Sequence, residues 1–525
     1  MATRIVDKQD HSLRLFHWAA LGIVLLTVVT RLPSLLHPQP IINEAIYSVV
    51  ANEIVDGGRP YVDAVERKPP LLFWTYAAIF EVAGKYNWKA LHVAALVWTL
   101  GTMAGLYAIG RALFDRETGL IAALLYSIFQ PWARGQNLAF NGELLMNLPI
   151  VWGWAIAFRP SSSRARPELV FSGALLCAGF LLKQPAAIAA VPLGIYLLLP
   201  DYRKSRGLNG MQSVTHAALL TLGFFGTLGA VAFVLWQQGI LREAFDRTFT
   251  DNSIPHVFYT TGIFCTLAFA AVCLPLVIGT IMTCRDRGLW DKKEAERTAL
   301  LGLLAASAVG TAAGGRFYVH YYIQLIPPMV MLAAPFYAQL WFRKIQPPYW
   351  LLRPPITCAW LALTVIAFSF VHWLELATRR KPSEAGQYLS EHSAPNDRIF
   401  VWGQEAEIYL EARRRPASRY IEAASLTGHV FGGVLRGVDT RKWIVPGAWT
   451  ALEEDFAKHP PAYVVDVQVP AKNAHYPVHD FPILADLLAA RYRQVARTAE
   501  GVIYRMDGSR GASEKSAGAE TNRSE

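Results

Sequence analysis

Residues 168–200 read ELVFSGALLCAGFLLKQPAAIAAVPLGIYLLLP, and the interpretation of the whole chain depends on this stretch. Two apolar runs, 168–182 and 185–200, are separated by Lys183-Gln184-Pro185. Because a helix needs about 20 apolar residues to cross a bilayer, the stretch is either one kinked span or a hairpin of two. Basic residues flank both ends, and basic loops collect on the cytoplasmic side of a membrane. The pattern therefore favours a hairpin that turns at Lys183 on the opposite, outer side.

Similar apolar runs occupy most of the first 377 residues. Hydrophobic residues make up 53% of the chain and charged residues 17%, against about 25% charged residues in soluble domains. We predict a polytopic, all-α membrane domain at 15–377 with about 11 spans. The spans are expected near 15–32, 90–109, 118–132, 144–158, 168–182, 185–200, 214–236, 259–283, 299–314, 322–342 and 355–377.

Lysine and arginine in the short loops predict the orientation of these spans. The basic loops hold Arg111, Arg116, Arg159, Arg164, Arg166, Arg203, Lys204, Arg206, Arg285, Arg287, Lys292, Lys293, Arg297, Arg343, Lys344 and Arg353. With these loops inside, residues 1–14 are cytoplasmic, and a first outer loop spans 33–89. A helical pattern is present at 71–84. If this helix crossed the membrane, every later loop would lie on the opposite side and the basic loops would be outside. We therefore expect a re-entrant or interfacial helix there. The net charge of +10 is then an orientation signal, and no nucleic-acid partner is expected.

The composition changes after the last apolar run. Residues 378–508 carry many charges, and short apolar runs alternate with amphipathic ones, which predicts a small α/β domain outside the membrane. We expect strands at 398–403, 462–467 and 502–506, with helices at 405–415 and 481–492. The Ser-, Gly- and Glu-rich end, 509–525, is expected to be disordered.

The first outer loop contains an unusual number of reactive side chains. Its acidic candidates are Glu44, Asp63 and Glu66, and Lys68 lies two residues after the last of them. A carboxylate within hydrogen-bond reach can remove a proton from a hydroxyl, and a lysine can stabilise a leaving phosphate. The alternative is an ordinary solvated loop with surface ion pairs.

Three further outer segments add polar candidates. These are Asn141 and Glu143, Lys183, and the run Arg316, His320 and Tyr321. A charge at membrane depth usually faces a cavity or a partner, and arginine is well suited to bind phosphate. Arg316 and His320 are four residues apart and would share one face of a helix. Each residue also has a purely structural alternative. Asn141 could cap a helix, and the helix dipole could stabilise Glu143. Lys183 could extend its ammonium to the membrane boundary, and the tyrosines could belong to an aromatic belt.

These residues resemble the GT-C type of membrane glycosyltransferases, and most closely the bacterial protein O-mannosyltransferase and lipid A aminoarabinose transferase group (glycosyltransferase family 39-like). An Asp-Glu pair followed by Tyr is matched by Asn43-Glu44 with Tyr47. The other matching elements are Gly58-Arg59-Pro60-Tyr61-Val62-Asp63, Lys68-Pro69-Pro70-Leu71, Lys183-Gln184-Pro185 and the stretch 316–328. The resemblance covers 30–377 well and 380–508 loosely.

The resemblance implies that a sugar moves from a polyprenyl-phosphate donor to an acceptor hydroxyl on the outer face of the inner (cytoplasmic) membrane. It implies donor-phosphate binding by Lys68, Lys183, Arg316 and His320, and substrate binding by Tyr47, Tyr61, Asn141, Glu143 and Tyr321. In such families the first-loop Asp activates the acceptor, but this chain has Asn43 there, and an amide cannot act as a general base. Glu44 or Asp63 is the expected substitute, followed by Glu66.

The acceptor implied by the resemblance is a glycolipid, a polysaccharide or a protein. No cofactor is certain, and a divalent metal is compatible with the resemblance but not required by it. Two other classes remain open at this point. A transporter or lipid flippase would also have many spans and intramembrane charges, and a membrane scaffold would leave the loop motifs unexplained.

Overall fold

The computed structural model describes residues 2–39, 41, 43–133, 135–159, 166–250, 257–343, 349–378, 382–429, 439–469 and 476–508, with side chains described from residue 14 onward. Arg164, Lys344 and the predicted tail 509–525 lie outside the described residues. The chain divides into two compact units. Unit 1 comprises 1–39, 89–234 and 256–379, and unit 2 comprises 40–88, 235–255 and 380–525.

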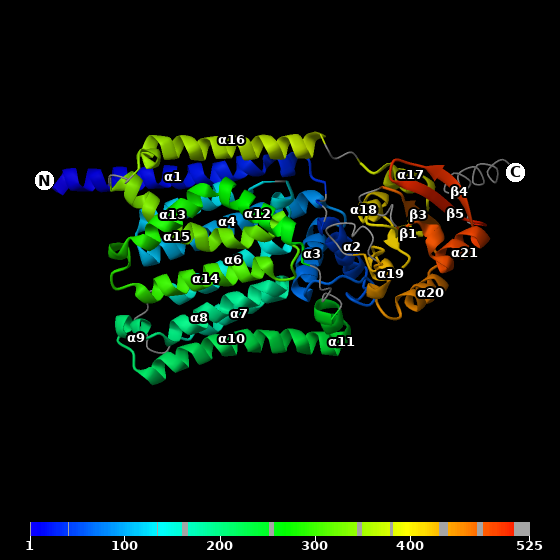
Figure 1. The fold of residues 1–525 in the computed structure, drawn as a ribbon, viewed down its shortest axis with the longest axis horizontal. Coiled ribbons are helices and arrows are strands. Elements are labelled where there is room, and N and C mark those ends of the chain that lie inside the picture. Colours follow the sequence, from blue (N-terminus) through cyan, green and yellow to red (C-terminus); the bar gives the residue numbers. More distant parts are fainter. Residues whose placement is uncertain are drawn as a thin grey trace. The chain divides into compact units, whose positions relative to one another are not determined.

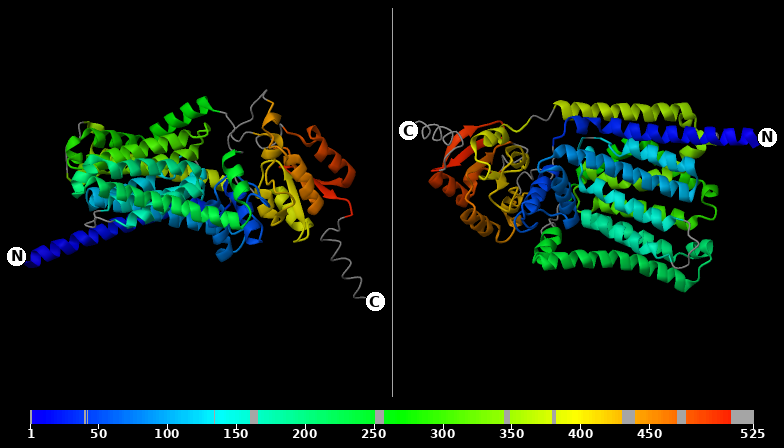
Figure 2. Two further views of the ribbon diagram at one scale, coloured as in Figure 1. Left: turned by 90° about the horizontal axis from the view of Figure 1, so that it is seen from below. Right: turned by 180° about the vertical axis from the view of Figure 1, so that it is seen from behind.

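Unit 1 is built from helices, and each predicted span overlaps at least one of them. Its helices are α1 (Ala2–Leu36), α4 (Trp88–Leu113), α5 (Arg116–Phe129), η1 (Gly135–Leu138), α6 (Gly142–Phe158), α7 (Glu168–Leu182), η2 (Gln184–Ala189), α8 (Ala190–Leu198), α9 (Pro200–Arg206), α10 (Gly210–Gln237), α12 (Tyr259–Val272), α13 (Leu274–Arg285), η4 (Arg287–Trp290), α14 (Glu294–Ala312), η5 (Val319–Leu325), α15 (Ile326–Phe342), η6 (Trp350–Leu352) and α16 (Pro354–Thr378). The helices lie side by side, with α1 beside α16 along one edge and α10 along the other (Figures 1 and 2).

Within the described residues, five helices are long and apolar enough to cross a membrane unaided, and two bent helix pairs raise that number to seven. The pairs are η2–α8 with α9, bent by 59°, and α12 with α13, bent by 77°. Both bends have a local cause, because Pro200 and Pro275 occupy the first turn of the second helix in each pair, where proline is tolerated. The described helices α6 and α7 are apolar but only 17 and 15 residues long.

Close helix packing in unit 1 depends on small residues. A Cβ on Gly173 of α7 would lie 1.9 Å from the Leu220 carbonyl oxygen of α10, and one on Gly223 would lie 1.8 Å from the Val170 carbonyl oxygen. The two backbones therefore touch, which is how helices pack in lipid, where burial of apolar surface provides little driving force. Any larger residue at either position must separate α7 from α10.

Unit 2 joins the first outer loop to the C-terminal part of the chain. It contains α2 (Asn43–Val55), α3 (Pro70–Ala83), α11 (Leu241–Phe245), the π-helical turn η3 (Asp246–Thr250), α17 (Glu384–His392), α18 (Glu407–Ala412), α19 (Ala424–Thr427), η7 (Arg441–Trp443), α20 (Ala448–Lys458), η8 (Val478–Asp480) and α21 (Pro482–Arg491). Its strands are β1 (Arg398–Trp402), β2 (Arg415–Pro416), β3 (Tyr463–Val467), β4 (Tyr492–Arg497) and β5 (Gly501–Met506).

The five strands form one mixed sheet in the order β2-β1-β3-β5-β4. Strand β1 pairs in parallel with β2 and β3, whereas β5 pairs antiparallel with β3 and β4. The core beside the sheet is apolar and includes Phe400, Trp402 and Val464, and Val65 from the first outer loop packs against it. The loop is thus part of the C-terminal fold.

The structure confirms the predicted all-α membrane domain with a small α/β domain, and it corrects several details. The first outer loop contains α2, which the sequence analysis did not predict. The helix expected at 405–415 ends at Ala412, because Arg413 adopts a left-handed conformation (φ 53°) that ends the helix, and Arg415 begins β2. Strands β2 and β4 were also missed. The predicted helix at 71–84 is present as α3.

Candidate functional site

The lysine that interrupts the hairpin is buried against a carboxylate of another helix. Lys183 follows α7 with an extended backbone (φ −158°, ψ 128°), and Pro185 begins η2. Its ammonium pairs with Glu143 Oε1, and the two side chains are 8% and 1% exposed. A buried charge is tolerated when a partner compensates it. Glu143 occupies the first turn of α6, so α6 and α7, which pack closely, bring the two charges together.

A histidine and a tyrosine from η5 complete this group. His320 Nε2 lies 3.6 Å from Glu143 Oε1, and the Lys183 ammonium lies 4.2 Å from the centre of the Tyr321 ring. The two rings meet edge to face with centroids 4.9 Å apart. A hydrogen bond from Asn147 Nδ2 to the Ile323 carbonyl (3.2 Å) holds η5 against α6. We call Glu143, Lys183, His320 and Tyr321 the buried charge cluster. It can present a cation and an imidazole to one small anion.

Two residues position the segment that leads into α6. Asn141 is the N-cap of this helix, since its side chain accepts a hydrogen bond from the Leu144 amide (3.1 Å). Arg31 of α1, only 1% exposed, donates to the Leu138 carbonyl and to Gln130 Oε1, each at 3.0 Å. Arg31 was missed by the sequence analysis, although a charge inside an apolar run is itself a signal.

Arg316 does not share a helix face with His320, so that prediction is wrong. Helix α14 ends at Ala312 and η5 begins at Val319, so Arg316 lies in the connection between them. Gly314, Gly315 and Phe317 have positive φ angles there (84°, 66° and 50°). The half-buried Arg316 forms no hydrogen bond or ion pair with any other described residue. It is placed by the turn, not by helical periodicity.

In unit 2, Glu66 and Lys68 form the second charged group. Lys68 Nζ lies 3.2 Å from Glu66 Oε1 and 5.9 Å from the centre of the Tyr47 ring. The Tyr61 hydroxyl donates to the Lys68 carbonyl (2.8 Å), and its ring packs edge-on against Phe73 of α3. The segment is held on both sides of Lys68, because Pro69 and Pro70 then begin α3.

The electrostatics of Glu66 keep its carboxyl ionised. Burial raises the pKa of Glu66, but the charges of Lys68 and Arg67 and the hydrogen bond from the Arg67 amide outweigh it, so the pKa lies below its usual range. The side chain is 12% exposed. Glu66 is therefore a mostly buried carboxylate that is charged at neutral pH and can accept a proton from a hydroxyl within reach.

The structure gives the other acidic candidates different surroundings. Glu44 is fully buried, and its Oε2 accepts the hydrogen bond from the Ile41 amide (2.8 Å), which closes the first turn of α2. Asn43 is the first residue of that helix. Asp63 is 43% exposed, and it pairs with Arg59 through the backbone amide (2.7 Å) and the side chain (3.6 Å). Of the three predicted carboxylates, Glu66 is the one beside Lys68.

Contacts from the C-terminal strands hold the first outer loop, and the sequence analysis did not identify them. Arg415 of β2 forms two hydrogen bonds to Glu53 of α2, Nε to Oε1 at 2.9 Å and the terminal guanidinium nitrogen to Oε2 at 2.5 Å. The Val65 amide donates to the Arg419 carbonyl (2.8 Å), which places Val65 alongside Tyr420. Glu66 is the next residue, so the C-terminal domain sets its position.

Metal ligands do not cluster in the part of the chain that the structure describes. No three His, Cys, Asp or Glu side chains lie close enough there to hold an ion.

A family model for dolichyl-phosphate-mannose-protein mannosyltransferases matches residues 67–236, about a third of the chain. A comparison with curated proteins found no match.

Solved structures share the fold over nearly the whole chain. ArnT from Cupriavidus metallidurans bound to undecaprenyl phosphate is 15% identical, with a TM-score of 0.60 over 93% of this chain and 98% of that one. Its apo state gives a TM-score of 0.59 at 12% identity, over 95% of this chain and 98% of that one. The apo oligosaccharyltransferase of Archaeoglobus fulgidus reaches 0.50 at 12% identity, over 86% and 70%. The chain therefore has the GT-C fold, which confirms the resemblance seen in the sequence.

Proposed function

We propose that this protein is a membrane glycosyltransferase that moves a sugar from a polyprenyl-phosphate donor to an acceptor hydroxyl. The observation that carries the proposal is the buried charge cluster. It holds a lysine and a histidine at the ends of apolar helices, where an anion attached to a lipid would have to be recognised. The match to the mannosyltransferase model and the ArnT structure with undecaprenyl phosphate support this choice of donor.

The proposed role of the buried charge cluster is to bind the donor phosphate. Glu143 compensates Lys183, and the approach of a phosphate gives Lys183 a second anionic partner. His320, whose Nε2 lies 3.6 Å from the same carboxylate oxygen, is a further donor to the phosphate. Arg316, with no described partner, adds a third. As the sugar leaves, these groups stabilise the charge that develops on the phosphate.

An apolar cavity next to Arg316 is suited to the isoprenoid chain. It has a volume of about 370 Å³ and is lined by Tyr259, Gly262, Ile263, Thr266, Leu267 and Phe317. Phe317 follows Arg316 directly, and the Ile263 and Leu267 side chains are 63% and 65% exposed. A chain lying along this face would exchange lipid contacts for protein contacts and keep its phosphate near Arg316.

The proposed role of Glu66 is to activate the acceptor. Glu66 takes the proton from the acceptor hydroxyl, whose oxygen attacks the anomeric carbon of the sugar. The bond between that carbon and the phosphate oxygen breaks, and polyprenyl phosphate leaves with the electron pair. A single displacement inverts the configuration at the anomeric carbon. Glu44 closes a helix turn and Asp63 is exposed, so both are weaker candidates than Glu66.

The proposed location is the inner membrane, with the buried charge cluster and the C-terminal domain on the outer side. The basic loops 111–116, 203–206 and 285–297 support this orientation. The acceptor is a glycolipid, a polysaccharide or a protein with a free hydroxyl on that side.

A transfer assay tests the function. Purified full-length protein in lipid nanodiscs is incubated with undecaprenyl phosphate carrying radiolabelled mannose or aminoarabinose and with an isolated envelope fraction. An enzyme forms a labelled glycoside and releases undecaprenyl phosphate. A flippase would instead move the intact donor across vesicle membranes. Unchanged donor with both sugars, together with identical surface glycans in cells with and without the gene, would contradict the proposal.

A further inference from the structure

A polar cavity lies at the opposite end of α15 from the buried charge cluster. Its volume is about 390 Å³, and its lining includes Phe114, Asp115, Asp286, Lys293, Gln339 and Arg343. Helix α15 begins directly after η5, which holds His320, and ends just before Arg343. Its 17 residues span about 25 Å, so the cavity is a separate site. It lies among the basic loops that the sequence assigns to the cytoplasmic side.

Packed helices and a buried tryptophan hold the walls of this cavity in place. Helix α15 packs against both α5 and α13, and the cavity lies where α5 begins and where α13 and α15 end. Trp290, 1% exposed, anchors the connection between α13 and α14 through a hydrogen bond to the Thr283 carbonyl (3.0 Å) and an edge contact with Phe114. The Lys293 amide donates to the Trp290 carbonyl (2.8 Å). The position of Lys293 is therefore set by a buried tryptophan, not by a free loop.

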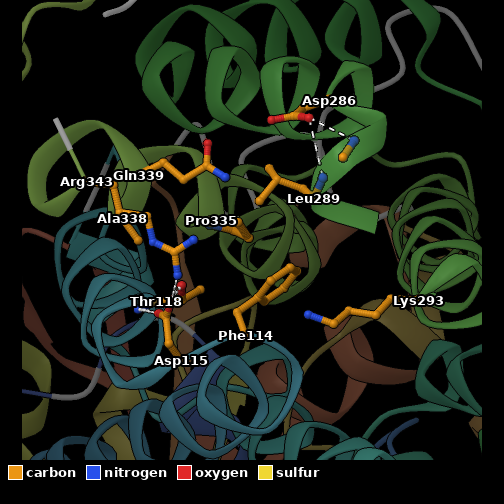
Figure 3. A pocket seen from close by; sticks show the side chains of 11 residues that line it. Phe114, Asp115, Thr118, Asp286, Leu289, Lys293, Pro335, Ala338, Gln339 and Arg343 are labelled. Atoms are coloured by element: carbon orange, nitrogen blue, oxygen red, sulfur yellow. Dashed lines mark hydrogen bonds and ion pairs between the residues drawn. The ribbon is translucent and has the colours of Figure 1, made fainter. Parts of the chain in front are cut away.

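Two cations approach the cavity from opposite sides of Phe114 (Figure 3). The half-buried Lys293 places its ammonium 4.7 Å from the centre of the Phe114 ring, and the ammonium itself forms no hydrogen bond or ion pair with any other described residue. Arg343 donates from one terminal nitrogen to Asp115 Oδ2 (2.5 Å), which leaves the other guanidinium N–H groups for a ligand. Lysine and arginine together are the usual partners of a phosphate.

The acidic residues in the lining give the cavity a balanced charge. Asp115 is neutralised by Arg343 and caps α5 through the Thr118 amide (2.8 Å). Asp286 uses Oδ1 to accept the Gly288 and Leu289 amides, and Oδ2 has no partner among the described residues. Lys293 and Asp286 thus offer one positive and one negative group. A simple anion would be repelled by Asp286, whereas a ligand carrying both a phosphate and an amine matches both charges.

We propose that this cavity binds an aminoalkyl phosphate, with Lys293 and Arg343 on the phosphate and Asp286 on the ammonium. Its volume lies within the usual range of small-ligand pockets, and pockets between membrane helices on the cytoplasmic side are known places for lipid headgroups. The same headgroup exists as phosphatidylethanolamine in a bilayer and as free phosphoethanolamine in solution.

Native mass spectrometry of the full-length protein, with lipid added from detergent solution, tests the proposal. We expect phosphatidylethanolamine to bind at least tenfold more tightly than phosphatidylglycerol, which lacks the amine. Lys293→Gln and Arg343→Gln should each reduce that affinity about tenfold, and Asp286→Asn should abolish the preference over phosphatidylglycerol. Lys292→Gln removes the same charge one residue away, from a side chain that does not line the cavity, and should change nothing.

A second experiment distinguishes the two sources of the headgroup, the membrane lipid and free phosphoethanolamine. Millimolar phosphoethanolamine should raise the unfolding temperature of the wild type, but not of Lys293→Gln, if the headgroup alone is sufficient. If only the lipid binds, the acyl chains are required and the membrane is the source. Equal binding of both lipids, equal losses in Lys292→Gln and Lys293→Gln, or no binding of either lipid or of phosphoethanolamine would overturn the proposal. The unfolding temperature of each variant without ligand shows whether it is folded.

Discussion

Breaking the pair between Arg415 and Glu53 should destabilise unit 2 unequally, depending on which partner is removed. The Glu53 side chain is 4% exposed, whereas Arg415 is 35% exposed and also lies 3.7 Å from Asp56. The hydrogen bonds that Arg415 donates to Glu53 raise the pKa of Arg415, as expected for a strong pair. Arg415→Met therefore leaves a buried carboxylate without its main cation and next to a second carboxylate. Glu53→Gln leaves Arg415, which is partly exposed to water and still has Asp56 as an acidic partner.

The size of each effect follows from burial. Removing one partner of a fully buried pair costs about 3–5 kcal/mol, and the partial exposure of Arg415 reduces this to about 2–3 kcal/mol for Arg415→Met. Glu53→Gln should cost about 1 kcal/mol, close to the value of an exposed pair. The double variant should lose about as much stability as Glu53→Gln, because it no longer contains the uncompensated Glu53 carboxylate. In a unit of this size the unfolding temperature falls by roughly 2 °C per kcal/mol. The expected decreases are therefore about 5 °C for Arg415→Met and about 2 °C for Glu53→Gln.

Tryptophan fluorescence during heating measures these differences, and limited proteolysis reports on unit 2 itself. Arg441→Met is the matched control, because Arg441 and Asp439 form a pair at 3.3 Å in which both side chains are exposed (79% and 69%). Its unfolding temperature should stay within about 1 °C of the wild type. Equal losses for Arg415→Met and Arg441→Met, or a larger loss for Glu53→Gln than for Arg415→Met, would show that burial does not set the size of these effects.

Three further predictions concern the charged groups of both units. Lys183→Met should cost about 3 kcal/mol by leaving Glu143 buried without its lysine, and Lys183→Met/Glu143→Gln should recover most of that loss in a thermal melt. Glu66→Gln should slow sugar transfer at least about 100-fold in the nanodisc assay. Asp63→Asn, at an exposed site, should transfer sugar at a rate within about threefold of the wild type. A larger loss for Asp63→Asn than for Glu66→Gln would show that Glu66 is not the base. Burial raises the pKa of Glu411 to about 7, so this residue should lower stability progressively as pH rises from about 4.5 through about 7. Glu411→Gln should then melt like the wild type near pH 4.5 but be more stable at pH 8 by about 1 kcal/mol, since partial exposure screens the charge; a gain that does not change with pH would contradict the assignment.

The sequence was sufficient to predict where the long apolar helices of unit 1 lie, because long apolar runs in this chain have few structural alternatives. It also predicted the break at Lys183, where a charge and a proline coincide between two apolar runs. The pairing of Lys183 with Glu143 could not be predicted, because two residues 40 positions apart meet only through the packing of α6 on α7. Sequence reasoning therefore named both residues and gave them separate roles.

Unit 2 was harder to predict, since its organisation depends on contacts distant in sequence. Arg415 and Glu53 are 362 residues apart, and nothing local to either marks the pair. Strand β4 escaped notice because its residues, YRQVAR, are mostly polar, and only pairing with β5 shows it to be a strand. The four-residue spacing of Arg316 and His320 indicated a shared helix face, but the positive φ angles at 314, 315 and 317 prevent a helix there. Spacing is informative only inside a regular element.

The most direct test of phosphate recognition by Lys183 is the transfer rate of Lys183→Met/Glu143→Gln from undecaprenyl phosphate carrying a labelled sugar. This variant removes both buried charges at once, so it should melt within about 2 °C of the wild type while losing the cation. We predict transfer at least about 100-fold slower, together with a higher donor KM. A folded double variant that transfers sugar at the wild-type rate, with an unchanged donor KM, would contradict the account.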